Sequence, residues 1–346
     1  MSGRKVCKLP SAHEIKKELP LSDDLSKKVF NQQQEVREAF DINSKKKVII
    51  MGPCSAYPDS SVIECAKKCL DLQKEVRENI LIIYRVYIQK PRTTIGWKGV
   101  MFRPDPFEKN TNITEGIKYS RRMMIEVAEL GLPIADEMLI PEMGLYFDDI
   151  LSYHAVGART TESQVHREYA SYLDAAVGLK NPTSGDLITA VNSVISAKAP
   201  HQFPLSGYQL ESDGNENAHL ILRGGGGKAN YEKFDDALEI MKKEKMKKPQ
   251  IIIDCSHENS VDPENGNIKD PMKQLDVLEY TSNEYLYRPE FKGWMIESNL
   301  LSGKHSPKNM SELIDGLSIT DACVAVDDVA PVIMAINEKL KRQRAA

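Results

Sequence analysis

The densest group of candidate chemical residues lies between Arg85 and Gly99, a segment that reads RVYIQKPRTTIGWKG. Arg85, Lys90 and Arg92 are its candidate anion ligands. A phosphate site needs cations and hydrogen-bond donors that are held in place, and arginine adds a planar fork of donors. The segment therefore predicts a phosphate site, although a solvated basic loop would have the same composition.

Three further cations follow short apolar runs elsewhere in the chain, namely Arg159, Lys180 and Arg223. With the first three they make six like charges in a chain whose formal net charge is −4. If these charges meet at one place, they repel one another unless anions bind among them. The set predicts a substrate with several negative charges, or two anionic substrates; a structural salt bridge is the alternative for each cation alone. The glycine run at 224–227 can bring backbone N–H groups to an anion, but it can equally be a turn, and it is no P-loop.

Four potential metal ligands also follow apolar runs: Cys54, His257, Glu297 and Asp321. A thiolate, an imidazole and two carboxylates suit a borderline divalent ion. No CxxC or HxxxH spacing supports such a site. Cys54 has an alternative as a small buried residue, His257 as a core histidine, and the carboxylates as partners for the cations. Glu137 is a further carboxylate in the same kind of position. The support for a metal site comes only from placement at strand ends that are neighbours on a closed barrel, so the alternatives stay open at this point.

These residues come after eight short apolar runs that are typical of buried strands. The runs are 48–51, 80–84, 132–135, 155–158, 175–179, 220–222, 251–253 and 294–296. Helical patterns alternate with them, for example at 61–77, 112–130 and 231–248. Alternating βα units predict an α/β fold, and eight of them predict a (β/α)8 TIM barrel. Because that fold places its chemistry at the carboxyl ends of the strands, we expect all the candidates at one mouth.

Residues 1–45 precede this pattern and are predicted to form an N-terminal extension, while residues 46–346 form the catalytic barrel, the whole being one structural domain. The alternation of strand and helix patterns is interrupted at 203–217, where Asp213-Gly214 is a hairpin signal. We therefore expect a β-hairpin inserted before strand six. The expected helix caps are Ser22, Thr183 or Ser184, and Asp328.

Composition excludes several classes of protein. Hydrophobic residues make up 41% and charged residues 28%, as in ordinary globular proteins, and the net charge gives no support for nucleic-acid binding. No apolar run reaches the ~18 residues of a membrane span, and residues 1–20 lack the apolar stretch of a signal peptide. The six cysteines are scattered and form no disulfide framework, so we expect a reducing cytoplasm.

Seven strings resemble those of the type I 3-deoxy-D-arabino-heptulosonate 7-phosphate (DAHP) synthases, in the same order. They are 52–55 (GPCS), 90–99 (KPRTTIGWKG), 157–164 (GARTTESQ), 222–225 (LRGG), 256–260 (SHENS), 296–298 (IES) and 318–323 (SITDAC). The resemblance spans essentially the whole chain. It implies the first step of the shikimate pathway and of aromatic amino acid biosynthesis, in which phosphoenolpyruvate condenses with D-erythrose 4-phosphate and water to give DAHP and phosphate.

The resemblance also implies roles for single residues. The implied metal ligands are Cys54, His257, Glu297 and Asp321, for one divalent ion (Mn, Fe, Co or Zn). Arg85, Lys90, Arg159, Lys180 and Arg223 fall where the family holds phosphoenolpyruvate, and Arg92 and Thr93 where it holds the aldose phosphate. In the catalytic group of Lys90, Glu137 and His257, we expect Lys90 to donate a proton to the developing alkoxide and Glu137 to orient the water. By family analogy the chain is expected to form a homodimer or homotetramer.

The chain also departs from the family pattern, though at no reacting group. Gln89 stands where relatives often have an acidic residue, 226–227 extend the usual Arg-Gly-Gly, and Cys255 stands where phenylalanine is common. The more consequential differences lie at 140–144 and Asp174, a region from which feedback-regulated relatives form an aromatic amino-acid pocket. We therefore expect altered or absent inhibition by phenylalanine, tyrosine or tryptophan.

Three other functions stay open at this point. A related synthase joins phosphoenolpyruvate to arabinose 5-phosphate, but its loop normally reads KANRSS, whereas this chain has KPRT at 90–93. A Schiff-base aldolase would use Lys180 and would be insensitive to a chelator. A catalytically silent binding homologue would not need the retained ligands and cations.

Overall fold

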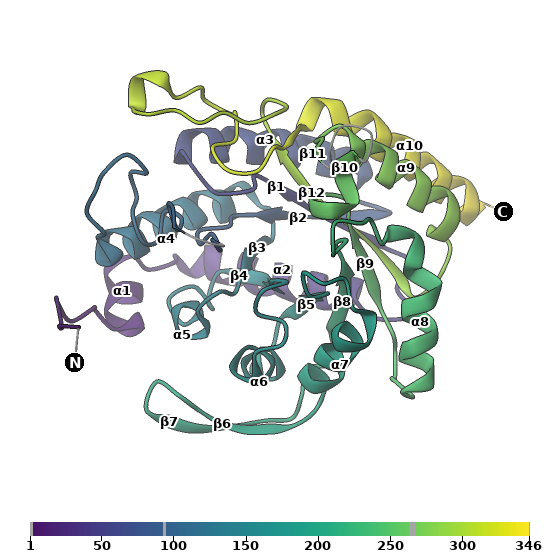
Figure 1. The fold of residues 1–346 in the computed structure, drawn as a ribbon, viewed down its shortest axis with the longest axis horizontal. Coiled ribbons are helices and arrows are strands. Elements are labelled where there is room, and N and C mark those ends of the chain that lie inside the picture. Colours follow the sequence, from purple (N-terminus) through teal and green to yellow (C-terminus); the bar gives the residue numbers. More distant parts are fainter. Residues whose placement is uncertain (1–2, 93–94, 263–267, 346) are drawn as a thin grey trace.

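The protein is described by a computed structural model that covers residues 3–92, 95–262 and 268–345. Eight parallel strands close into a barrel with helices around it, which confirms the predicted (β/α)8 fold (Figure 1). In order around the barrel they are β1 (Lys47–Gly52), β2 (Ile80–Arg85), β3 (Ile134–Glu137), β4 (Leu151–Val156), β5 (Ala176–Lys180), β8 (Ala218–Leu222), β9 (Ile251–Asp254) and β12 (Phe291–Asn299). The pairing of β1 with β12, with Met51 opposite Ile296, closes the circle.

Every residue of these eight strands is buried, which explains why most of them are recognisable as continuous apolar runs. The fourth strand is the exception. It covers Leu151–Val156 rather than the predicted 155–158, because Ser152 and His154 interrupt its apolar run although both side chains are buried.

Helices cover the outside of the barrel. They are α3 (Asp59–Val76), α4 (Ile113–Leu130), the single turn α5 (Pro141–Gly144), α6 (Gln164–Tyr172), α7 (Leu187–Lys198), α8 (Phe234–Lys243), α9 (Lys273–Tyr285) and α10 (Val326–Ala345). None of the helices in the described part of the chain has the length and apolar character needed to cross a membrane.

Two predicted helix caps are wrong. Asp186, rather than Thr183 or Ser184, caps α7 by accepting a hydrogen bond from the backbone N–H of Thr189, because the chain makes one more turn before the helix starts. Asp328 lies in the first turn of α10 and is not its cap.

The helix predicted at 231–248 is shorter than expected. It consists of the 3-10 turn η1 (Tyr231–Lys233) followed by α8, which ends at Lys243. Lys245 and Lys248 have φ angles of 56° and 52°, a left-handed conformation that a continuing α-helix does not accommodate.

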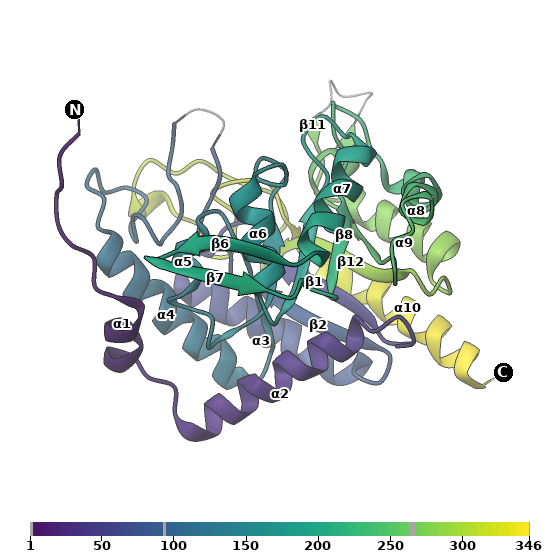
Figure 2. The ribbon, with the colours of Figure 1, turned by 90° about the horizontal axis from the view of Figure 1, so that it is seen from below.

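The segment before the barrel contributes two helices, α1 (Ala12–Glu18) and α2 (Asp23–Ala39). Ser22 caps α2 as predicted, since its hydroxyl accepts the backbone N–H of Leu25. Figure 2 shows α2 lying along one side of the molecule, at the end of the barrel away from β11. Phe40, just after α2, is buried in the same cluster as the inward-facing strand residues Tyr153 and Met295, so this segment closes the base of the barrel.

The predicted hairpin exists, but its turn is elsewhere. Strands β6 (His201–Leu205) and β7 (Tyr208–Ser212) pair antiparallel before β8 and project from the barrel near α6 (Figure 1). The turn is Ser206-Gly207, with φ of 47° and 83°, as a two-residue hairpin turn requires. Asp213-Gly214 instead follows β7, where the chain returns to the barrel.

Short elements complete the mouth. They are η2 (His257–Ser260), β10 (Val261–Asp262), β11 (Ile268–Lys269), η3 (Met310–Glu312) and β13 (Val324–Ala325). β10 and β11 form a small antiparallel pair after β9, and β13 pairs with the carboxyl end of β12.

Candidate active site

A cavity of about 220 Å³ opens at the carboxyl ends of the barrel strands. It is lined by Arg85, Lys90, Pro91, Arg92, Glu137, Ala158, Arg159, Lys180, Arg223, His257, Lys269, Glu297 and Asp321. The mouth therefore brings together all the candidate residues that the structure describes, apart from Cys54, which lies against this lining. Thr93 lies outside the described residues.

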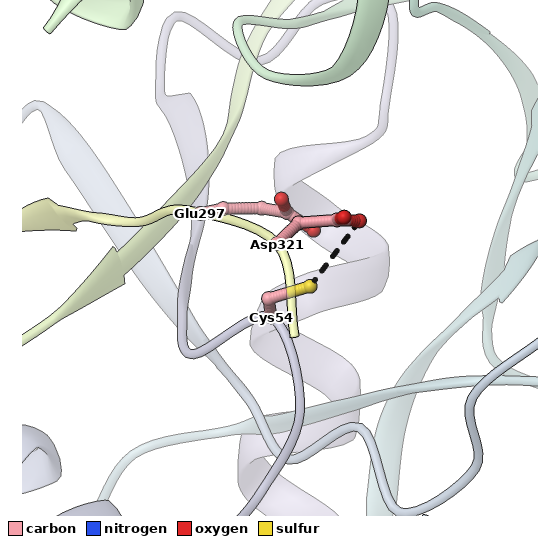
Figure 3. A group of neighbouring side chains, drawn as sticks. All are labelled: Cys54, Glu297 and Asp321. Atoms are coloured by element: carbon pink, nitrogen blue, oxygen red, sulfur yellow. Dashed lines mark hydrogen bonds between the residues drawn. The ribbon is translucent and has the colours of Figure 1, made fainter. Parts of the chain in front are cut away.

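Cys54, Glu297 and Asp321 form a compact group of potential metal ligands (Figure 3). One donor atom from each lies within 4.8 Å of the others, and the Cys54 Sγ is 3.7 Å from an Asp321 oxygen. His257 is adjacent rather than part of this trio, since its Nε2 lies 3.9 Å from Glu297 Oε1. His257 has a φ of 58°, an uncommon backbone conformation for a non-glycine residue that functional sites often contain.

The electrostatics of this group are set by burial and by mutual charge. Burial, reinforced by Glu297, raises the pKa of the Cys54 thiol to about 11. Burial lowers the pKa of His257 to about 4, so its imidazole is neutral near pH 7. Burial opposes ionisation of Glu297 and Asp321, but the positive charges around them outweigh it and lower both pKa values. The group thus offers a neutral imidazole and two carboxylates, together with a thiol that a bound cation would have to deprotonate.

Lys90 lies directly against this group. Its Nζ donates a hydrogen bond to the Cys54 Sγ and lies 3.5 Å from Asp321 Oδ2. Burial alone would lower the pKa of Lys90, but the acidic groups Cys54, Glu297 and Asp321 outweigh burial and raise it. Lys90 is therefore held as an ammonium ion at the centre of the cavity.

Three cations on other strands are buried, with exposed fractions of 1% for Arg85, 3% for Lys180 and 6% for Arg223. Each has a carboxylate partner. Arg85 Nη2 lies 3.1 Å from Glu297, Lys180 Nζ 3.0 Å from Asp254, and Arg223 Nη1 3.4 Å from Glu258.

These pairs do not use all the donors. Within the described residues, no hydrogen-bond acceptor reaches Arg85 Nε, Arg85 Nη1 or Arg223 Nε, although all three atoms are buried. Buried donors in native proteins are nearly always paired, so unused guanidinium N–H groups in a cavity indicate that an anion binds there.

The remaining candidates are Arg92, Arg159 and Glu137. Arg92 and Arg159 are exposed. The Nε of Arg92 donates to the carbonyl of Trp97, 2.8 Å away, which fixes the direction of its side chain. Glu137, at the end of β3, is 8% exposed, and a Cβ at Gly157 would lie 2.2 Å from its Oε1. A larger residue at position 157 would therefore force that carboxylate to move.

Three residues of the mouth were not predicted from the sequence. Asp254 and Glu258 are the partners of Lys180 and Arg223. Asp254 is the last residue of β9, and it follows a buried apolar run as the predicted candidates do, so the same sequence pattern could have identified it. Lys269 lines the cavity from β11, in a segment for which the chain shows no recognisable motif.

Comparisons with known proteins agree with one another. The model of the DAHP synthetase I family matches residues 30–332. The chain is 34% identical to the Tyr-sensitive phospho-2-dehydro-3-deoxyheptonate aldolase of Escherichia coli (strain K12), over 98% of this chain and 95% of that protein. It is 32% identical to the phospho-2-dehydro-3-deoxyheptonate aldolase of Corynebacterium glutamicum, over 98% of this chain and 93% of that one. A solved structure of such an aldolase from Francisella tularensis SCHU S4 superposes with a TM-score of 0.90 at 36% identity, covering 99% of this chain and 98% of that one.

Proposed function

Because this chain belongs to the DAHP synthetase I family, we propose that its barrel mouth holds two phosphorylated substrates around one divalent metal ion. The reaction itself follows from the family. The chain condenses phosphoenolpyruvate with D-erythrose 4-phosphate and water to give DAHP and phosphate, the first step of aromatic amino acid biosynthesis. The observation that carries the proposal is the cavity itself, in which six candidate cations surround a group of metal-ligating side chains.

For the metal ion we propose four ligands, Cys54, His257, Glu297 and Asp321. The donor set supports this, because mixed sulfur, nitrogen and oxygen ligands suit Mn, Fe, Co or Zn. Three of the donors already lie within 4.8 Å of one another, and the fourth is a neutral imidazole beside them. Bound there, a divalent ion supplies Lewis-acid polarisation of an aldehyde carbonyl.

For phosphoenolpyruvate we propose Arg85, Lys90, Arg159, Lys180 and Arg223. This substrate carries a phosphate and a carboxylate on three carbons, and a cluster of largely buried cations matches that charge. The unused N–H groups of Arg85 and Arg223 support the assignment, since a phosphate or carboxylate oxygen would satisfy them. For the phosphate of erythrose 4-phosphate we propose Arg92 and Thr93, after Pro91 at the cavity rim.

In the proposed mechanism, C3 of phosphoenolpyruvate attacks the aldehyde carbon of erythrose 4-phosphate. Lys90, kept protonated by its acidic neighbours, donates a proton to the developing alkoxide. Water, oriented by Glu137, adds at C2 of the former phosphoenolpyruvate. Phosphate then leaves from the hemiketal phosphate, with cleavage of the C–O bond.

The experiment that tests this function measures phosphate release from phosphoenolpyruvate with erythrose 4-phosphate or with arabinose 5-phosphate, each with and without a chelator. We expect release with erythrose 4-phosphate, its loss in the chelator, and its recovery when Mn²⁺, Fe²⁺, Co²⁺ or Zn²⁺ is added back. Preference for arabinose 5-phosphate would indicate the related synthase. Chelator-resistant turnover together with borohydride trapping at Lys180 would indicate a Schiff-base aldolase, and no turnover with any metal a silent homologue.

We also propose a homodimer or homotetramer in the cytoplasm. The six cysteines are free thiols, which fits a reducing compartment. Light scattering coupled to size exclusion measures the assembly, and a monomer at micromolar concentration would contradict that part of the proposal.

A further inference from the structure

Lys269 lines the same cavity, and no motif in the chain gives it a role. It lies on β11, in the segment that joins β9 to α9, so it reaches the mouth from a part of the chain outside the recognisable strings. Its Nζ is 3.9 Å from Asp321 Oδ2, and its side chain is 36% exposed. Lys269 therefore presents an ammonium group at the open side of the cavity.

Asp321 does not need Lys269 as a counter-ion. Lys90 lies closer, at 3.5 Å from the same oxygen, and is only 10% exposed. The cavity lining carries seven lysine and arginine side chains, Lys269 included, against three carboxylates. Asp254 and Glu258, the partners of Lys180 and Arg223 behind the lining, raise the carboxylates to five, so cations remain in excess. An ammonium added to such an excess is repelled unless an anion binds nearby. The ion pair with Asp321 alone therefore does not account for a lysine at this place.

Depth separates the cations of the mouth into two groups. Arg85, Lys180 and Arg223 are almost completely buried, whereas Lys269 is partly exposed and Arg92 is exposed. Phosphoenolpyruvate, the three-carbon substrate, matches the buried cations Arg85, Lys180 and Arg223. Erythrose 4-phosphate carries its aldehyde and its phosphate at opposite ends of a four-carbon chain, so its phosphate remains near the opening when its aldehyde lies among the metal-ligating side chains.

We propose that Lys269 binds the phosphate of D-erythrose 4-phosphate, as a point charge that adds to the arginine fork of Arg92. This inference rests on the proposed function. It assigns Lys269 to recognition of the aldose phosphate, not to the bond-forming step.

The test compares the kinetics of Lys269→Met with those of the wild type. We expect the KM for erythrose 4-phosphate to rise about tenfold or more, the loss typical of a charged hydrogen bond. The KM for phosphoenolpyruvate is expected to stay within about twofold, because Lys269 lies outside the buried cation group. Lys269→Arg, which keeps the charge, should recover most of the affinity.

A binding measurement gives a readout that does not depend on turnover. D-erythritol 4-phosphate, in which the aldehyde is reduced, cannot condense, and calorimetric titration with it should show the same loss of affinity in Lys269→Met. The matched control is Lys273→Met, since Lys273 pairs with Asp262 at 3.2 Å beside the same strand pair and does not line the cavity. Its kinetics and binding are expected to equal those of the wild type.

Two outcomes would overturn the proposal. One is a change of less than twofold in both the KM for erythrose 4-phosphate and the affinity for erythritol 4-phosphate. The other is an equal rise in both KM values with a fall in kcat, which would mean that Lys269 acts through Asp321. A wild-type protein without phosphate release would instead contradict the proposed function, and the titration would still report on Lys269.

Discussion

At the base of the barrel a buried tyrosine, a buried histidine and a buried lysine are paired within the protein, whereas at the mouth several buried arginine N–H groups are not. At the base, Tyr153 Oη lies 2.8 Å from His219 Nε2, and His219 Nδ1 lies 2.8 Å from the carbonyl of Asn217. Lys47 donates to the carbonyl of Phe291 at 2.6 Å. At the mouth, buried N–H groups of Arg85 and Arg223 have no acceptor among the described residues. The same strands therefore end on one side in a core whose titratable side chains are paired, and on the other in buried cations with unused hydrogen-bond donors.

The base of the barrel contributes stability to the fold, whereas the mouth lowers it. Closing the base with Phe40 buries apolar surface, which favours the folded state. Gathering cations at the mouth sets like charges against one another, and that repulsion is relieved only by anions. Substitutions at the mouth should therefore change activity far more than stability, and substitutions at the base the reverse.

The largest effect is expected for Lys90→Met at the mouth. We expect kcat to fall by about 10²- to 10⁴-fold, the usual contribution of a general acid, while the circular dichroism spectrum and melting temperature stay close to those of the wild type. Lys98→Met is the control, because Lys98 is exposed on the same loop, with its Nζ 5.7 Å from the ring centre of Phe102. Activity of Lys90→Met within tenfold of the wild type would rule out the proton-donor role.

Phe40→Ala should show the opposite pattern at the base. Phe40 is 1% exposed and stacks on His219 at 4.2 Å between ring centres. Its truncation should lower the free energy of unfolding by about 3–5 kcal/mol, measured by urea denaturation, with kcat of the folded protein nearly unchanged. Phe30→Ala, on the exposed side of α2, should change stability by less than about 0.5 kcal/mol. Equal losses in the two variants would show that the base is not closed as described.

A smaller effect concerns pH. Burial lowers the pKa of His219 from 6.5 to about 3. Between these values the unfolded chain binds a proton at His219 and the folded protein does not, so the contribution of this residue to stability is lost as the pH falls below 6.5. The slope is at most about 1.4 kcal/mol per pH unit. His219→Gln should flatten the pH dependence of unfolding by about that amount between pH 6 and 4.

The control for the pH experiment is His13→Gln on the exposed side of α1, which should leave the slope as it is in the wild type. The same slope in His219→Gln and wild type would mean that His219 takes up a proton in the folded protein.

The smallest expected effect is the response to aromatic amino acids. A cavity of about 610 Å³ lies near Leu145 and Asp174, and its described lining contains three aspartates but no lysine or arginine. Each of these aspartates is paired with a cation behind the lining, Lys16, Arg121 or Arg37, so those cations already have carboxylate partners. Two relatives from Escherichia coli are named Tyr-sensitive and Phe-sensitive. For this chain, in contrast, we expect 1 mM phenylalanine, tyrosine or tryptophan to change the activity little. Strong inhibition by phenylalanine would refute this.

The barrel was largely predictable because its strands are buried on both faces and interrupted by few polar residues. The prediction failed where this was not so: at β4, where Ser152 and His154 break the apolar run, and at the hairpin turn, where Ser206-Gly207 gives a weaker signal than Asp213-Gly214. The helix predicted to continue to residue 248 ends at Lys243. The two residues with left-handed backbone conformation that follow it, Lys245 and Lys248, are lysines, which no propensity rule marks as helix breakers.

Most of the candidate site was predictable for a related reason, since strand ends in a barrel converge. Arg85, Lys180 and Glu297 each occupy the carboxyl end of a strand, so their common mouth followed from the fold. Two other residues of the mouth were less predictable. Glu258, the partner of Arg223, and Lys269, which lines the cavity, lie on short elements after β9, and only the folded path of that segment brings them to the mouth.

The pairing of β1 with β12 also bears on the order in which the protein is made. A ribosome delivers β1 early and β12 near the end, so the barrel cannot close until the last strand has emerged. Glu297 lies on that strand and Asp321 beyond it, whereas Cys54 was synthesised long before. A nascent or prematurely terminated chain thus carries the thiol and several of the cations but lacks the carboxylates that complete the group. If this group holds the proposed metal ion, catalytic competence arises only after the segment up to Asp321 has been made, and shorter translation fragments do not act on the same metabolites.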